Sequence, residues 1–284
     1  MADRAAIARD TLRIIEDGGY LSADGRRVSL TDAVAAARAG TRLYDLTVVS
    51  RPRPHGPKTT AIQVTAETTC EAIVRMENED SSHLGALNFA SARNPGGGFL
   101  GGAQAQEEAL ARSSALYPCL LAQPDYYARN RASRSALYLD LAIFSPAVPF
   151  FRNDAGNLLS RASCCSVITA PAPNAGAVQQ NQPADLPEIA PTLLRRAELV
   201  LAVAAIEGVD RLILGAWGCG VFRNDPWLVA ETFAGLLLGD GRFAGAFAEV
   251  VFAIFDRSPG QKVLAAFATT FGASRSGPTS PFRF

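Results

Sequence analysis

Histidine is scarce in this chain, and its cysteines do not have the spacing of a metal or redox site. With only His55 and His83 available, the sequence argues against a zinc centre and against a Ser-His-Asp triad. The five cysteines are odd in number and include no Cys-x-x-Cys pair, while the adjacent Cys164 and Cys165 resemble small apolar residues of a strand. A reducing cytosol fits this pattern best.

An excess of charge of either sign is also missing. Lysine and arginine together number 27, as do aspartate and glutamate, so the formal net charge is zero. A neutral chain is not built to coat a nucleic-acid backbone, and we expect no direct sequence-specific binding to nucleic acid. Any polyanion should be bound locally, through loops and helix termini.

Long apolar runs are absent as well. The most apolar helix candidate, Leu199 to Ile206 with its neighbours, is too short to cross a bilayer, so we expect no membrane partner. The first residues, Met1 to Arg4, lack the basic-then-apolar pattern of a secretion signal, and we expect a cytoplasmic protein. The hydrophobic fraction of 48% is that of an ordinary globular chain with ample material for a core.

The N-terminal part of the sequence is mostly helical in pattern. Apolar spacing predicts helices over Ala5 to Asp17 and Thr31 to Ala39, followed by one strand over Leu43 to Val49. The proline-rich segment Arg51 to Pro57 is expected to be a rigid connector. We interpret residues 1–58 as a helical extension that packs on the rest of the chain.

From about residue 60 the pattern changes to strands that alternate with helices. The expected strands are Ala61–Thr65, Leu84–Phe89, two or three between Ala136 and Phe151, Cys165–Ala170, Arg211–Gly215 and Glu249–Phe255. The expected helices are Cys70–Met76, one from Gln104 that stops before Pro118, Pro187–Ile206, Pro226–Leu238 and Gln261–Phe271, with a polar connector over Gln179–Pro183. This alternation predicts a three-layer α/β/α domain over residues 59–272 with a mixed, largely parallel sheet, and a flexible tail over residues 273–284.

A glycine-rich stretch is the most informative feature of the chain. Five of the seven residues from Gly96 to Gly102 are glycine, and Gln106-Glu107-Glu108 follows at the start of a helix. A loop without Cβ atoms lets a ligand touch the main chain, and a helix N-terminus attracts an anion. Glutamate in a first turn stabilises any helix, so the acidic pair alone is not evidence of a site. Together with the loop, it predicts a phosphorylated ligand held beside a carboxylate.

A second glycine-bearing loop follows a later strand. Gly218 and Gly220 precede a helix that is expected to start with Asp225 as its N-cap and Pro226 at its first position. Loops at the carboxyl ends of strands form the ligand crevice of open α/β sheets, and two such loops can clamp a diphosphate from both sides. Neither loop has the Lys-Ser/Thr ending of a nucleotide-hydrolase P-loop or a clean dinucleotide fingerprint, which argues against kinase and dehydrogenase chemistry.

Two aromatic residues of the second loop have different interpretations. Trp217 is expected to be a core residue. Phe222, on a glycine loop beside the expected sugar site, is expected to press a ribose into place.

The two loops resemble those of a known family. Gly96-Gly97-Gly98, followed after seven residues by Gln106-Glu107-Glu108, resembles the signature of poly(ADP-ribose) glycohydrolases. The stretch from Gly215 to Phe222 resembles that family's second diphosphate-binding loop, and Leu87–Ser91 and Ile168–Asn174 are similar to the shorter bacterial type. The resemblance covers most of the chain from about residue 60. It implies a macrodomain fold that binds ADP-ribose and hydrolyses ribose–ribose O-glycosidic bonds of poly(ADP-ribose) with no metal or cofactor.

The resemblance also implies roles for individual residues. Glu108 would be the catalytic acid, and Glu107 would hold the ribose. The implied substrate-binding residues are Asn94, Gly96, Gly97, Gly98, Gln106, Gly218, Cys219, Gly220, Val221 and Phe222. Ser91 stands where vertebrate relatives usually carry asparagine, which leaves a polar contact at the distal ribose open. The implied partners are poly(ADP-ribose) and ADP-ribosylated proteins, with a monomer acting in the DNA damage response.

The spacing of the two glutamates constrains the mechanism. Successive helix residues point about 100° apart, so Glu107 and Glu108 cannot face each other across a bond as paired glycosidase carboxylates do. One carboxyl must carry out both proton transfers, and we expect Glu108 to release ADP-ribose mainly from chain ends. Two alternatives stay open: a macrodomain that removes single ADP-ribose units from proteins, and a non-catalytic ADP-ribose reader.

Overall fold

The structure, a computed structural model, describes residues 3–50, 59–80 and 82–272. The connector expected over residues 51–57 and the flexible tail expected over residues 273–284 lie outside the described residues.

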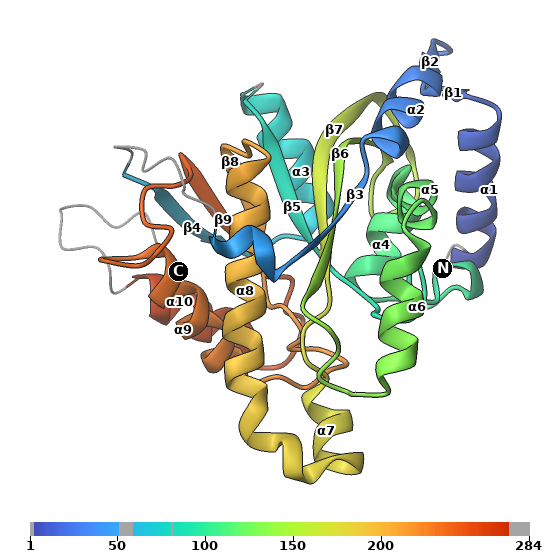
Figure 1. The fold of residues 1–284 in the computed structure, drawn as a ribbon. Helices are drawn as coiled ribbons and strands as arrows, with labels where there is room; N and C mark the ends of the chain where they lie inside the picture. Colours follow the sequence, from blue (N-terminus) through green and yellow to red (C-terminus); the bar gives the residue numbers. More distant parts are fainter. Residues whose placement is uncertain (1–2, 51–58, 81, 273–284) are drawn as a thin grey trace.

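A seven-stranded sheet runs through the middle of the molecule (Figure 1). Its strands are β3 (Arg42–Asp45), β4 (Ala61–Thr65), β5 (Leu84–Phe89), β6 (Leu141–Arg152), β7 (Leu158–Ala170), β8 (Arg211–Leu214) and β9 (Glu249–Ala253). Their order in space is β3-β6-β7-β5-β8-β9-β4, in which β6 pairs antiparallel with both neighbours and the other four pairs are parallel. The prediction of a mixed, largely parallel sheet is confirmed.

Helices cover both faces of this sheet. Neighbouring residues of a central strand point to opposite faces, so they belong to different apolar clusters. Leu87 and Leu212 belong to one buried apolar cluster, and the preceding Ala86 and following Ile213 belong to another. The first cluster includes residues of the helices α8 (Ile189–Ile206), α9 (Pro226–Leu237) and α10 (Lys262–Gly272). The second includes residues of α3 (Thr69–Glu79), α4 (Gln106–Ser113), α5 (Leu116–Leu121) and α6 (Pro124–Ser133). The predicted three-layer α/β/α architecture is therefore confirmed.

Several predicted elements differ from the structure for identifiable reasons. The strand expected over Leu43–Val49 ends at Asp45, whose carboxylate accepts hydrogen bonds from the Thr47 backbone and hydroxyl, and a 3₁₀ helix, η1 (Leu46–Ser50), follows. The strands expected between Ala136 and Phe151 are one long strand, β6, which passes its prolines with a register shift between Ser145 and Val148.

The connecting segments contain more helix than the sequence indicated. The expected polar connector over Gln179–Pro183 contains the end of α7 (Ala175–Asn181) and the start of a 3₁₀ helix, η3 (Pro183–Glu188). The helix expected from Gln104 is α4, which ends at Ser113. Pro118 lies within α5, where a first-turn proline leaves no intrahelical hydrogen bond unmade.

The N-terminal segment is joined closely to the main sheet. It consists of α1 (Arg4–Glu16), the hairpin β1 (Gly19–Leu21) and β2 (Arg27–Ser29), α2 (Thr31–Ala39) and the edge strand β3. The Thr11 hydroxyl of α1 donates to the Arg112 carbonyl oxygen of α4 at 2.6 Å, and the Arg152 guanidinium of β6 donates to Thr11. This segment supplies the strand β3 to the sheet that it shares with the rest of the chain. A domain boundary at residue 58 stays a prediction. None of the described helices is long and apolar enough to cross a membrane.

Candidate active site

The two glycine-bearing loops border one cavity of about 1000 Å³ at the carboxyl ends of the central strands. The first loop follows β5 and the second follows β8, and these two strands pair in parallel, so both loops leave the same edge of the sheet. Residues from Ala253 to Arg257, after β9, complete the lining on a third side. The predicted single crevice between the loops is thus present, as expected at this edge of an open sheet.

The glycine loop positions the carboxylate of Glu108. The backbone N–H of Gly98 donates to Glu108 Oε1 at 3.0 Å. Gly97 has φ of +59°, and a Cβ placed there would lie 2.2 Å from the same oxygen. The other oxygen, Glu108 Oε2, is buried and has no hydrogen-bond partner among the described residues. The loop therefore orients one oxygen of Glu108 and leaves the other available.

Glu107 is the more deeply placed of the two carboxyls. Its side chain is 3% exposed, and its oxygens accept hydrogen bonds from the Ser91 backbone at 2.6 Å and from the Asn88 amide at 3.3 Å. The pKa of Glu107 is raised to about 8, chiefly by burial; the charge of Glu108 acts in the same direction, and both hydrogen bonds oppose the shift. Glu107 is accordingly mostly neutral at pH 7.

The neighbouring Asn88 links Glu107 to Thr169. Asn88 Oδ1 is buried without a partner, while its nitrogen faces Glu107 and the Thr169 hydroxyl. The bond from the Asn88 amide to Glu107 Oε1 favours the charged form of Glu107 and so opposes the rise in its pKa that burial causes.

We expect Glu107→Gln to flatten the dependence of stability on pH. The folded pKa of about 8 lies above the value of 4.5 for a free glutamate, so the wild-type protein loses stability as pH rises from 4.5 to 8. The loss approaches about 1.4 kcal/mol per pH unit within that window. Urea unfolding of both proteins at pH 5 and pH 8 measures it, and an equal fall in the two proteins would contradict a protonated Glu107.

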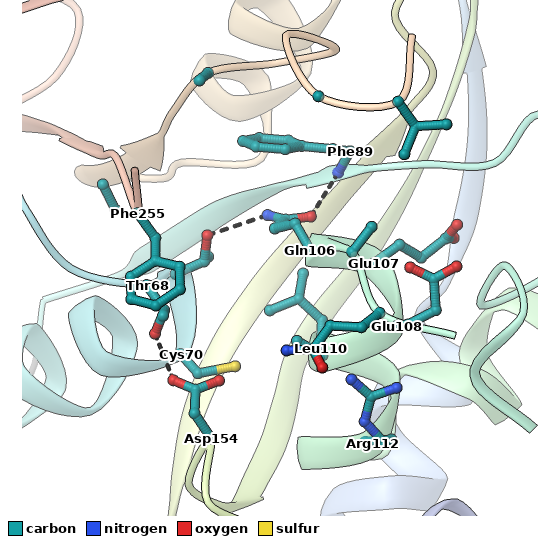
Figure 2. Close-up of a pocket in the computed structure, with 18 of the residues that line it drawn as sticks. Thr68, Cys70, Phe89, Gln106, Glu107, Glu108, Leu110, Arg112, Asp154 and Phe255 are labelled. Carbon is teal, nitrogen blue, oxygen red and sulfur yellow. Dashed lines mark hydrogen bonds between the residues drawn. The ribbon is translucent and has the colours of Figure 1, made fainter. Parts of the chain in front are cut away.

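Gln106 and Ser91 organise the loop rather than offer free polar groups. The Gln106 side chain accepts from the Phe89 backbone N–H at 2.8 Å and donates to the Leu87 carbonyl oxygen and the Thr69 hydroxyl. Figure 2 shows this amide lying between Phe255 and the two glutamates. The Ser91 hydroxyl oxygen accepts the backbone N–H groups that follow it in the loop. The Gln106 amide already makes three hydrogen bonds within the protein. Contact between Gln106 and the substrate stays a prediction.

The predicted binding residues of the first loop divide into two groups. Asn94 lines the cavity, and its carbonyl oxygen accepts the Gly97 N–H at 3.0 Å. Gly96, Gly97 and Gly98 are outside the lining, and a Cβ at Gly96 would meet the Phe99 ring at 2.9 Å. The structure thus assigns these glycines a role in loop packing and in holding Glu108. Their contact with a diphosphate stays a prediction.

The second loop contains one glycine required by packing and one that is not. A Cβ at Gly218, which has φ of +74°, would lie 2.4 Å from the Asn224 amide nitrogen and 2.5 Å from the Ala172 methyl group. A Cβ at Gly220 would meet no atom within 4 Å. Both line the cavity. The backbone of Gly220 is therefore open for a ligand to approach.

The other predicted residues of the second loop also line the cavity. Burial raises the pKa of the Cys219 thiol to about 12, so it is not a nucleophile at neutral pH. Val221 is 78% exposed at the rim. The Phe222 ring lies 5.9 Å from that of Tyr138. Trp217 is fully buried and donates to a backbone carbonyl oxygen, which confirms its interpretation as a core residue.

Sequence reasoning missed three groups of lining residues. Tyr138 comes from the connection between α6 and β6, and Phe255 follows β9, 51% exposed with the Arg257 guanidinium over its ring. Phe255 could have been predicted from the sequence, because the carboxyl end of β9 lies at the same end of the sheet as the two loops. At the start of α3, the Thr68 hydroxyl donates to Asp154, whose pKa is raised by burial (Figure 2). No cluster of metal-ligating side chains occurs in the part of the chain that the structure describes.

The fold and the cavity define a macrodomain-like α/β/α enzyme with a carboxylate pair beside a glycine loop. The family model described as "Microbial-type PARG, catalytic domain" matches residues 8–153. The chain belongs to the microbial-type poly(ADP-ribose) glycohydrolase (PARG) family and is an enzyme of that class.

Solved structures of this family are closely similar along nearly their whole length. Poly(ADP-ribose) glycohydrolase from Thermomonospora curvata is 49% identical, with a TM-score of 0.91 over 95% of this chain and 100% of that one. The same enzyme bound to the inhibitor ADP-HPD is 49% identical, with a TM-score of 0.88 over 95% of this chain and 99% of that one. The enzyme from Deinococcus radiodurans in complex with ADP-ribose is 52% identical, with a TM-score of 0.78 over 85% of this chain and 98% of that one. A search of curated proteins found no match.

Proposed function

We propose that this glycohydrolase cleaves the ribose–ribose bonds of poly(ADP-ribose) with Glu108 as both general acid and general base, and releases ADP-ribose mainly from chain ends. The observation that carries this proposal is the state of the Glu108 carboxyl. One oxygen is fixed by the Gly98 N–H, and the other is buried beside the cavity without a partner. An oriented carboxyl with one unsatisfied oxygen is suited to proton transfer.

The reaction needs one carboxyl in two protonation states. Protonated Glu108 gives its proton to the departing 2′ oxygen as the bond from C1″ to that oxygen breaks and positive charge develops on the ribose. A water then attacks C1″ and loses a proton to the Glu108 carboxylate, which restores the starting enzyme. Glu107, neutral and bonded to the Ser91 backbone, would hold the ribose hydroxyls beside it.

The cavity supports binding of one terminal unit. Its volume of about 1000 Å³ is at the upper end of ligand pockets and suits a single nucleotide diphosphate sugar. The complex of the Deinococcus radiodurans relative with ADP-ribose supports the same ligand here. We place the diphosphate against Gly220, the terminal ribose against Phe222, and the adenine against the exposed ring of Phe255.

Turnover of purified polymer tests the proposal. We expect free ADP-ribose as the main product from the first minutes, with long chains shortened gradually, when the reaction is resolved by ion-exchange chromatography. Early appearance of short oligomers would contradict release from chain ends. An enzyme that removed only single protein-linked units, or a protein that bound ADP-ribose without turnover, would leave the polymer intact.

The open position of Gly220 gives a direct test of the diphosphate site. We expect Gly220→Val to weaken ADP-ribose binding at least about tenfold, or about 1.4 kcal/mol, with the melting temperature unchanged. Gly218→Val should instead lower the melting temperature, because its left-handed φ and its contacts with Asn224 and Ala172 exclude a side chain. Calorimetric affinity and thermal melts separate the two effects. Normal ADP-ribose binding by Gly220→Val would exclude close backbone approach at this loop.

We further propose that the protein acts as a monomer in the cytoplasm, on ADP-ribosylated proteins produced in the DNA damage response. All five cysteines are free thiols, which suits a reducing compartment.

A further inference from the structure

Four exposed arginines lie on the first loop, the end of α6 and the second loop, on segments that adjoin the cavity. Arg93 lines the cavity two residues after Ser91, whose N–H binds Glu107. The Arg131 guanidinium of α6 donates to the Arg93 carbonyl oxygen at 2.7 Å, which places it against the same loop. Arg134 ends α6, and Arg223 directly follows Phe222 in the second loop.

The connection that joins these arginines is itself part of the site. Tyr138, four residues after Arg134, lines the cavity, and its ring contacts Phe222. The Arg223 side chain packs across Gly176 of α7, next to Asn174, whose amide donates to the Tyr138 hydroxyl. The four arginines, defined here as the arginine rim, thus run from the glycine loop through the end of α6 to the second loop.

The rim is cationic without local compensation. None of its four guanidinium groups forms an ion pair within the described residues, whereas the buried Arg196 and Arg211 both pair with carboxylates. The acidic residues nearest to the rim along the chain are Asp125, at the opposite end of α6, Asp140, which pairs with Arg195 and Arg196, and Asp225, whose carboxylate caps α9. A chain with zero net charge therefore gathers unpaired positive charge on the segments that adjoin its cavity.

The chemistry of the polymer puts an anion at this place. When the terminal ribose lies beside Glu108, the departing 2′ oxygen belongs to the adenosine ribose of the next unit. That same ribose carries a diphosphate on its 5′ carbon, so two negative charges lie within one sugar of the bond that breaks. Arginine is well suited to phosphate oxygens because its planar fork donates two hydrogen bonds at once.

We propose that the arginine rim is a second subsite, which binds the diphosphate of the penultimate ADP-ribose unit, with Arg93 and Arg131 as its principal contacts. This inference rests on the proposed function, since it takes the terminal ribose to lie beside Glu108. The rim would hold the polymer during cleavage and then retain the shortened chain for the next event.

Two substrates with the same scissile bond test this subsite. One is the ADP-ribose dimer, and the other is ADP-ribose joined through its C1″ to the 2′ oxygen of adenosine, which lacks the second diphosphate. We expect Arg93→Gln combined with Arg131→Gln to raise KM for the dimer about tenfold at low salt, with kcat nearly unchanged. The double variant should cleave the phosphate-free substrate within about twofold of wild type and bind ADP-ribose normally.

A matched control and a single variant guard against indirect effects. Arg38 occupies the last turn of α2 as Arg131 does that of α6, and it is exposed and remote from the cavity, so Arg38→Gln should match wild type on both substrates. Arg93→Gln alone keeps the Arg131 bond to the Arg93 backbone, and it should still raise KM for the dimer severalfold.

The outcomes separate the subsite from the proposed function. Unchanged KM for the dimer, or an equal loss on both substrates, would overturn the subsite while the wild-type enzyme still cleaves both. A wild-type enzyme that cleaves neither substrate would overturn the proposed function, and the subsite with it.

Discussion

Replacement of Glu108 by glutamine is expected to lower kcat on poly(ADP-ribose) by at least about 10³-fold, because one carboxyl performs both proton transfers. Binding of ADP-ribose should stay within about threefold of wild type. The glutamine oxygen can accept the Gly98 N–H as Glu108 Oε1 does, and its amide nitrogen takes the place of the unpartnered Oε2. Single-turnover rates on polymer and calorimetry with ADP-ribose measure the two quantities.

A control with the same chemical change is available on the surface. Glu231 is exposed on α9, so Glu231→Gln should leave turnover and binding at wild-type values. If Glu108→Gln keeps a tenth or more of wild-type turnover, another group transfers the proton. Glu107, whose pKa is raised to about 8, would then become the candidate acid.

Replacement of Gly97 by alanine is expected to reduce turnover about 100-fold, through displacement of Glu108. The added Cβ would lie 2.2 Å from Glu108 Oε1 in a backbone conformation with φ of +59°, which alanine adopts only with strain. A displaced catalytic group loses rate even when the substrate is bound. The melting temperature should also fall by several degrees, from about 1–2 kcal/mol of backbone strain.

Gly101 supplies the matched control within the same loop. A Cβ there would meet nothing within 4 Å, and its φ is outside the left-handed region, so Gly101→Ala should behave as wild type. Turnover of Gly97→Ala is measured at a temperature where calorimetry with ADP-ribose shows it fully folded. Wild-type turnover of that folded protein would show that the glycine loop does not position Glu108.

Much of the fold followed from local sequence pattern. The predicted bounds of β4, β5 and α2 coincide with those in the structure, because apolar periodicity and clear turn residues mark each of them. The three-layer architecture followed from the alternation of strands and helices. The structure differed in two ways. A local contact ends β3, because the Asp45 carboxylate accepts hydrogen bonds from Thr47 two residues later, whereas a tertiary contact lets β6 continue through its prolines with a register shift against β7.

The candidate site divides in the same way. Gly96 to Gly98 and Gln106 to Glu108 are close in sequence, so their spacing alone predicted a loop with a carboxylate beside it. The N-cap of α9 was also predictable, since capping depends on adjacent residues. The different roles of Gly218 and Gly220 were not, because Ala172 comes from another part of the chain and decides which glycine is enclosed.

The sequence by itself determined the fold class, the family and the two loops that carry the site, because each depends on patterns within a few residues or on periodicity along one element. Only the tertiary structure decided how those parts act. Burial at the carboxyl ends of the strands raises the pKa of Glu107, and a backbone N–H from the glycine loop binds one oxygen of Glu108 while the other has no partner. The arginine rim likewise unites loops from three segments far apart in the chain. Burial and charge at a point depend on every segment that reaches it, and these are properties that no single stretch of sequence contains.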